Sequence, residues 1–178
     1  MLSLPFNSNV NFQKLVSQEA SFKTSIDKSF MPRLVETCHE VLSPIEADFK
    51  FYEDLQGMNT IEGSLKVRVS FVCQRCSKVF EKQIEASFKS TCDEQKAKSL
   101  QIEDKVDIVP LEEDGSFELL SYLEDCLLLE IPYITTHEEG NSECVENQDW
   151  EFGKIEKSKE DNPFAQLSAL KDKLKSQN

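Results

Sequence analysis

Apolar and polar side chains alternate along Ile61-Glu62-Gly63-Ser64-Leu65-Lys66-Val67-Arg68-Val69-Ser70-Phe71, with the apolar residues on odd positions. A period of two over this length is typical of a β-strand with one buried and one wet face. The same alternation occurs in residues 45–51 and, on even positions and interrupted by Lys82, in residues 80–88. Because the connections between these three segments are short, we predict an antiparallel meander.

Shorter elements surround this meander. We expect short helices over residues 10–17, 29–39 and 117–129, and short strands over residues 20–26 and 106–111. Ser116 is expected to cap the helix over residues 117–129, and Pro132 follows its end. The predicted fold class is therefore α+β, with a small, barrel-like antiparallel sheet flanked by short helices.

The chain is expected to divide near residue 134. Residues 1–134 would form the α+β core domain, and residues 135–178 an acidic loop followed by a C-terminal helix. Asn162 is a typical N-cap, and Pro163 then stands at the first helical position. A helix of roughly a dozen residues is marginal alone, so we expect it to dock on this protein or on a partner. The partner-binding candidates are Asn162, Pro163, Phe164, Leu167 and Leu170.

Charge is unevenly distributed along the chain. The 20 basic and 33 acidic residues give a net charge of -13, and residues 91–178 carry all of it. Residues 103–151 contain 16 acidic side chains and a single base, Lys105. A conventional nucleic-acid binder is disfavoured, because phosphate neutralisation needs a basic surface. An acidic surface would instead attract a Lys/Arg-rich protein.

Composition excludes several other classes. With 39% apolar residues and 12 Phe, the chain can build a core, so wholesale disorder is not expected. No run of about 18 apolar residues exists, so we predict no membrane span. The first residues lack the basic region of a secretory signal, and we expect a cytoplasmic protein whose six cysteines are mostly reduced.

The most chemical feature is Cys73-Gln74-Arg75-Cys76 at the tip of the predicted hairpin. A Cys-x-x-Cys turn can direct two sulfurs at one metal ion, and tetrahedral zinc needs two more ligands. His137 and Cys144 in the polar loop are the best second pair, which gives Cys73, Cys76, His137 and Cys144 as candidate zinc ligands. Two alternatives remain open, namely free surface thiols from a lost site and a redox dithiol activated by Arg75. Thioredoxin-type pairs, however, begin a helix, whereas this pair joins two strands.

Catalysis finds little support in the sequence. No pair of carboxylates stands out from the acidic runs, and no Gly-rich phosphate loop is present. Only two histidines occur, so any Ser–His–Asp triad would be arbitrary. We therefore expect a protein that is not an enzyme and has no small-molecule substrate.

Several motifs follow one another in a specific order. They are Val72-Cys73-Gln74-Arg75-Cys76, Leu127-Leu128-Leu129-Glu130-Ile131-Pro132, His137 to Cys144, Phe152-Gly153, and Asn162-Pro163-Phe164-Ala165 with Leu167 and Leu170-Lys171. Their order and spacing, over residues 40–175, resemble the YceD family, also called the large ribosomal RNA subunit accumulation protein, and its proteobacterial branch above all.

The resemblance implies a role in ribosome biogenesis. Members of that family are non-enzymatic bacterial proteins, with plastid relatives, needed for normal accumulation of 23S ribosomal RNA. Their genes often neighbour one for a large-subunit ribosomal protein. Many relatives have Cys-x-x-Cys at the hairpin and a second, more cysteine-rich cluster, which correspond here to Cys73 and Cys76, then His137 and Cys144.

Three functions follow as hypotheses. The leading one is a ribosome-biogenesis factor for 23S ribosomal RNA that acts through a basic large-subunit ribosomal protein or a pre-ribosomal particle. The second is direct binding of 23S ribosomal RNA by the basic hairpin, with candidate residues Lys66, Arg68, Arg75, Lys78 and Lys82. The third is a thiol-redox protein that uses the Cys-x-x-Cys pair.

Overall fold

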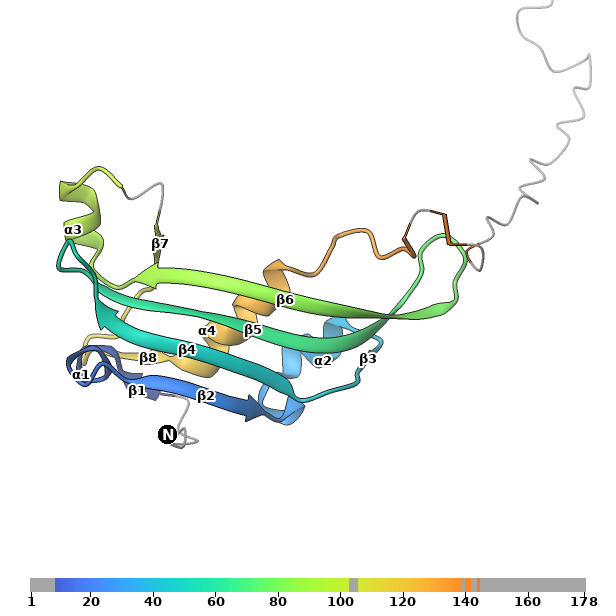
Figure 1. The fold of residues 1–178 in the computed structure, drawn as a ribbon, viewed down its shortest axis with the longest axis horizontal. Coiled ribbons are helices and arrows are strands. Elements are labelled where there is room, and N and C mark those ends of the chain that lie inside the picture. The colour runs from blue at the N-terminus through green and yellow to red at the C-terminus, as the bar shows by residue number, and fades with distance from the viewer. Residues whose placement is uncertain (1–8, 103–105, 139, 142–143, 145–178) are drawn as a thin grey trace, which may run out of the picture. The chain divides into compact units, whose positions relative to one another are not determined.

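The predicted meander forms the centre of the protein, as a computed structural model shows for residues 9–102, 106–138, 140–141 and 144 (Figure 1). Its three strands are β4 (Ile45–Glu53), β5 (Asn59–Val72) and β6 (Val79–Thr91). Both pairings are antiparallel, and the β5–β6 hairpin stays in register from Thr60 opposite Thr91 to Val72 opposite Val79. The predicted meander is thus confirmed.

Short strands complete the sheet. β2 (Ser21–Ile26) pairs with β4, β3 (Glu40–Val41) pairs with β5, and β7 (Asp107–Ile108) lies parallel to the end of β6. The strand order β2-β4-β5-β6-β7 leaves β2 and β7 at opposite edges. The α+β class is confirmed, but the sheet does not close, so the expected barrel-like form is wrong in this respect. β7 occupies only part of the strand expected over residues 106–111, and it pairs with β6 and not with β2 at the other edge.

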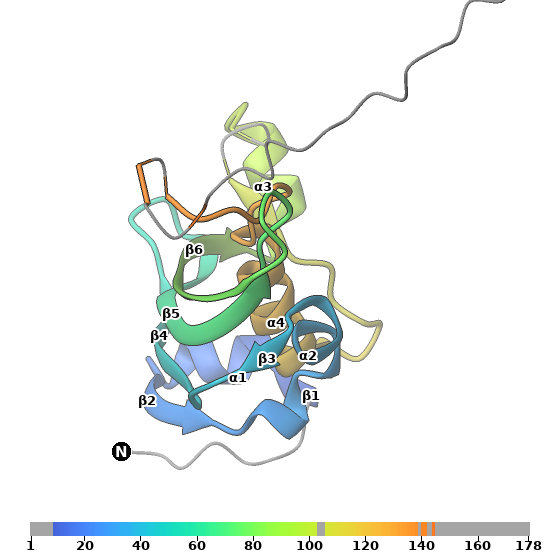
Figure 2. The same cartoon turned by 90° about the vertical axis from the view of Figure 1, so that its right-hand side faces the viewer.

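The helices are α1 (Phe12–Ser17), the 3₁₀ helix η1 (Lys28–Phe30), α2 (Pro32–Thr37), α3 (Glu94–Ser99) and α4 (Leu119–Leu129). α1, α2 and α4 cover one face of the sheet, and α3 follows the end of β6. α4 crosses the sheet face with α2 beside it, and the opposite face of the sheet carries no helix in the described part (Figures 1 and 2). The helices thus supply one layer and the curved sheet the other. None of the helices in the described ranges is long and apolar enough to cross a membrane.

The start of α4 differs from the sequence prediction. Ser116 lies in β8 (Ser116–Glu118), which pairs with β1 (Asn9–Asn11) in a separate two-stranded ladder. Its hydroxyl and amide both bond to the Asp114 carboxylate, and α4 begins only at Leu119. The expected helix cap at Ser116 is therefore wrong, because a strand pairing with the N-terminal segment takes this residue instead.

The core lies between the sheet and α4. Buried side chains come from alternate positions of the long strands, and an edge-to-face aromatic cluster joins Phe12, Phe22, Phe49, Phe51 and Phe117. The other positions of the strands point to solvent and form ion pairs across the strands, Lys23–Asp48, Lys50–Glu62 and Lys66–Glu85. This alternation is the period of two seen in the sequence.

A buried carboxylate ties α2 to α4. Glu124 on α4 is almost fully buried and accepts hydrogen bonds from the Leu34 amide (2.9 Å) and from Nε of Arg33 (2.8 Å). Met31, the residue before α2, makes no side-chain capping hydrogen bond, so the Glu124 carboxylate of α4 accepts from a free amide in the first turn of α2 instead. The two helices are thereby fixed beside the hairpin tip of the sheet.

Candidate metal centre

The turn between β5 and β6 brings the two hairpin cysteines together. The Cys73 amide donates to the Lys78 carbonyl (2.9 Å), and the Ser77 amide donates to the Cys73 carbonyl (2.8 Å). Ser77 has a φ of +59°, the left-handed conformation that lets so short a turn close. Cys73 is fully buried at the base of this turn, and Cys76 is half-buried.

The segment after α4 runs back along the hairpin tip. The Gln74 amide donates to the Thr135 carbonyl (2.8 Å), and the Thr135 hydroxyl donates to the Val72 carbonyl (3.2 Å). Two residues further on, the His137 ring packs on Phe80 with 4.8 Å between ring centroids. These contacts hold the buried imidazole of His137 beside the cysteines.

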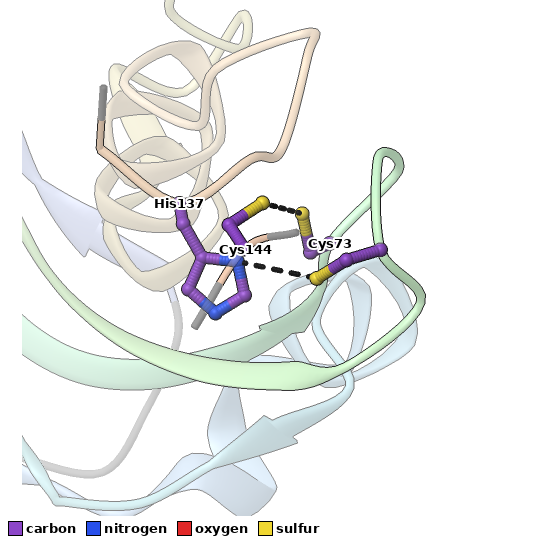
Figure 3. A group of neighbouring side chains, drawn as sticks. Cys73, His137 and Cys144 are labelled. Carbon is purple, nitrogen blue, oxygen red and sulfur yellow. Dashed lines mark hydrogen bonds between the residues drawn. The ribbon is translucent and has the colours of Figure 1, made fainter. Parts of the chain in front are cut away.

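The structure brings all four candidate ligands to one point. The Sγ atoms of Cys73, Cys76 and Cys144 and a ring nitrogen of His137 all lie within 4.8 Å of one another. Cys73 and Cys144 are 3.8 Å apart at Sγ, and Cys76 Sγ lies 3.6 Å from His137 Nδ1 (Figure 3). The cysteines are free, because a disulfide would need about 2.05 Å between sulfurs.

These spacings match a tetrahedral zinc site. With Zn–S near 2.3 Å and Zn–N near 2.0–2.1 Å, tetrahedral angles place two sulfurs about 3.8 Å apart and sulfur and nitrogen about 3.6 Å apart. Two of the separations between ligand atoms, 3.8 Å for Cys73–Cys144 and 3.6 Å for Cys76–His137, agree with these values, and all of them lie within 4.8 Å. The residues present therefore fit a Cys₃His zinc site.

The surroundings of the cluster favour the thiolate at Cys73 and oppose it at Cys144. Burial raises the pKa of Cys73, but hydrogen bonds from the backbone at Cys76, His137 and Arg75 outweigh it and lower that pKa to about 5. Burial and the neighbouring sulfurs of Cys76 and Cys73 raise the pKa of Cys144, which the guanidinium of Arg75 opposes. Metal ligation needs the deprotonated sulfur.

Arg75 belongs to this cluster. Its Nε donates to Cys144 Sγ (3.1 Å), and its Nη2 donates to the His137 carbonyl (3.2 Å). Three thiolates around Zn²⁺ would carry one net negative charge, which the guanidinium offsets. Sequence reasoning assigned Arg75 to RNA or to thiol activation and missed this bridging position.

The other basic residues that the sequence suggested for RNA binding do not lie on one surface of the structure. Lys66 and Arg68 are exposed on the outer face of β5, where Lys66 pairs with Glu85 at 3.2 Å. Lys82 stands opposite the buried Val69, so it points to the other side of the sheet. Lys78 lies in the exposed part of the hairpin turn. Lys66 and Lys82 thus lie on opposite faces, and RNA binding by the whole set stays a prediction.

The remaining residues to compare with the sequence prediction are the partner-binding candidates and Thr135. The partner-binding candidates at residues 162–170 lie outside the described residues. Sequence reasoning missed Thr135, whose hydrogen bonds dock the second pair of ligands on the hairpin. A lone threonine in a polar segment gives no signal of such a role.

Comparison with known proteins identifies the family of the chain. The family model described as "Large ribosomal RNA subunit accumulation protein YceD" matches residues 61–171, which include most of β5, the hairpin tip and all four cluster residues. A protein of the same name from Haemophilus influenzae is 29% identical over 145 residues, which cover 80% of this chain and 83% of that relative. No solved structure matches the chain. Because the family match spans more than half of the sequence, the chain belongs to the YceD family of large ribosomal RNA subunit accumulation proteins.

Proposed function

We propose that this protein is a non-enzymatic factor of the cytoplasm that supports accumulation of large-subunit ribosomal RNA. The support is membership of a family that carries this role in its name, together with a relative of the same name. No catalytic step is assigned to the protein. It would act by binding, and the charge distribution indicates the class of partner.

The proposed partner is a basic protein of the large ribosomal subunit. The observation that carries this proposal is a segment rich in exposed carboxylates, residues 106–153, which contains no Lys or Arg of its own; of its carboxylates, Asp125 pairs with Arg33 on α2. Eight acidic side chains of this segment are exposed in the described structure, namely Asp107, Glu112, Glu113, Asp114, Glu118, Asp125, Glu130 and Glu138. Such a surface repels phosphates and speeds the encounter with Lys/Arg-rich proteins at low salt.

A binding experiment with graded salt tests this partner class. The immobilised full chain is exposed to salt-extracted proteins of purified large ribosomal subunits, and the retained proteins are identified by mass spectrometry. Retention of a basic protein should fall as salt rises, and should fall further when the eight exposed carboxylates are changed to amides. A control variant changes Glu46, Asp48 and Glu85, acidic residues of the sheet's outer face, to amides. Unchanged retention by the eight-fold variant would refute the proposed contact.

We further propose that the cluster of Cys73, Cys76, His137 and Cys144 binds one zinc ion in a structural role. All four positions of a tetrahedral site are filled by protein ligands, an arrangement typical of structural rather than catalytic zinc. The ion would join the hairpin tip to the segment after α4. Loss of the ion would then loosen that segment while the meander persists.

Metal analysis of the purified protein tests the zinc site. The wild-type chain should contain about one zinc ion, and Cys76→Ser should lose most of it, because three ligands hold zinc far less tightly than four. Cys92→Ser is the matched control, since Cys92 is also half-buried but lies after the opposite end of β6. Equal zinc content in the two variants would contradict the assignment.

Direct RNA binding is the alternative, and the exposed pair Lys66 and Arg68 is the part of the hairpin that could provide it. Mobility shifts of 23S ribosomal RNA fragments with the wild type and with Arg68→Glu distinguish the two functions. A strong shift that is lost in the variant would favour RNA, and the absence of any shift would favour the basic protein.

A further inference from the structure

An exposed apolar surface lies directly beside the metal centre. The exposed fraction is 97% for Tyr133, 63% for Ile134 and 44% for Val72. The hydrogen bonds of Thr135 to Val72 and Gln74 hold these residues next to one another. Isolated apolar side chains are common on protein surfaces, but adjacent ones mark binding sites.

Two of these side chains, Val72 and Tyr133, line an open groove of about 730 Å³. One wall is the end of β5 with Phe71 and Val72, and the opposite wall is the segment after α4 with Ile131 and Tyr133. His39, before β3, lies at a third side. The groove is therefore wide enough for one or two side chains of a partner, and its walls are largely apolar.

The border of the groove is acidic away from the hairpin tip. Exposed carboxylates stand next in sequence to three of its lining residues, namely Glu36 beside Thr37, Glu40 beside His39 and Glu130 beside Ile131. Among the described residues that line the groove there is no Lys or Arg. Arg75 follows Gln74 and Lys78 follows Ser77, so the end at the hairpin tip is basic and the carboxylates lie at the other sides. An apolar side chain with Lys or Arg close to it in sequence complements this surface.

The metal cluster holds one wall of the groove in place. Cys73 both lines the groove and belongs to the cluster, and His137 follows Tyr133 by four residues in the same segment. The contacts of Gln74 with the Thr135 and Tyr133 carbonyls connect the wall to the hairpin. Zinc at the cluster would therefore fix the separation of the two walls.

We propose that this groove binds an apolar side chain, flanked by Lys or Arg, of the basic large-subunit ribosomal protein that the chain recognises. This inference rests on the proposed function, and it adds the place and the chemistry of the contact. The apolar side chain lies between Val72 and Tyr133, and the basic neighbours face Glu36, Glu40 and Glu130. Release of zinc loosens the Tyr133 wall and weakens the binding.

Photo-crosslinking tests the location. A benzophenone amino acid replaces Tyr133 in the full chain, and in a control chain it replaces Leu55, a fully exposed residue in the turn between β4 and β5 at the other end of the sheet. The probe is the salt-extracted protein mixture from purified large ribosomal subunits. The chain labelled at residue 133 should crosslink to a segment that contains an apolar residue next to Lys or Arg, and the chain labelled at 55 should not. Equal crosslinking at both positions overturns the proposal.

Affinity measurements test the energetic role of the groove. For the retained ribosomal protein, Tyr133→Ser and Val72→Ser should each raise Kd about tenfold or more, as for central interface residues, whereas Leu55→Ser should leave it unchanged. All three side chains are at least partly exposed, and thermal unfolding verifies that the variants fold. Removal of zinc by a chelator should raise Kd of the wild type in the same direction.

The outcomes separate this inference from the proposed function. If the wild-type chain retains no basic large-subunit protein, the proposed function fails and the groove has no partner of this class. If it retains one with unchanged Kd in both groove variants, the proposed function stands and the groove proposal is refuted.

Discussion

Replacing Glu124 by alanine tests whether the contact between α2 and α4 depends on a single buried carboxylate. The variant leaves the fully buried Leu34 amide without its acceptor, which costs about 1–3 kcal/mol. The Arg33 side chain is 45% exposed and keeps its contacts with Asp125 and Ser121, so the lost ion pair adds at most about 1 kcal/mol. We expect Glu124→Ala to lower the free energy of unfolding by about 1–4 kcal/mol, against a usual total of about 5–15 kcal/mol.

Urea-induced unfolding, followed by circular dichroism, measures this change. Glu124→Gln keeps one carbonyl oxygen for the Leu34 amide, so it should fall between the wild type and the alanine variant. Asp125→Ala is the matched control, because this neighbouring carboxylate also pairs with Arg33 but its side chain is 55% exposed, and the expected loss is below about 1 kcal/mol. If Glu124→Ala costs no more than Asp125→Ala, the reasoning about the orphaned amide is refuted.

Three further predictions follow from local geometry. Gly63→Ala would place its Cβ 2.3 Å from the Cβ of Phe49 on β4, so we expect the free energy of unfolding in urea to fall by about 1–3 kcal/mol. The control Ser64→Ala should change it by no more than about 0.5 kcal/mol, and equal effects of the two variants would contradict the clash. The Tyr52 hydroxyl donates to Glu62 (2.6 Å) and lowers the pKa of that carboxyl, so Tyr52→Phe should raise the pKa in an NMR titration. A carboxyl whose pKa is lowered in the folded state stabilises the fold above the unfolded pKa of about 4.3, and this stabilisation is lost as the pH falls through the folded pKa. The variant lacks part of it and should therefore lose less stability on acidification. An unchanged pKa of Glu62 in the variant would contradict the mechanism. Chelation of zinc should speed amide hydrogen exchange at the hairpin tip and leave β4 protected, whereas equal acceleration in both would argue against a local metal clamp.

The sheet could be predicted because its signal is local. In residues 61–71 each outward side chain is polar and nearly each inward one is apolar, and the hairpin partner repeats this with opposite parity. The sequence also placed His137 and Cys144 with the hairpin cysteines, because few other side chains could complete a metal site. Proximity of the four sulfur and nitrogen atoms is an observation of the structure, and the bound metal stays a prediction.

The missed features depend on contacts between distant segments. Ser116 has the side chain of a helix cap, but pairing with Asn11 draws it into a strand. Glu124 looked like one acid among many, since nothing in an acidic segment distinguishes a carboxylate that accepts a bond from another helix. The open sheet has a similar cause, because the length of β7 is set by its neighbours rather than by its own pattern.

The ladder between β1 and β8 also has a consequence for the time course of folding during synthesis. Its strands pair Asn9 with Glu118 and Asn11 with Ser116, so roughly a hundred residues separate the partners. At about 5–20 residues per second, the ribosome needs several seconds to more than ten to reach the second strand after the first has been made. The β2-β4-β5-β6 sheet can form during that interval, whereas the segment around β1 must wait for its partner. A nascent chain that has not yet reached residue 116 would therefore have a sheet while its N-terminal strand β1 lacks its partner β8.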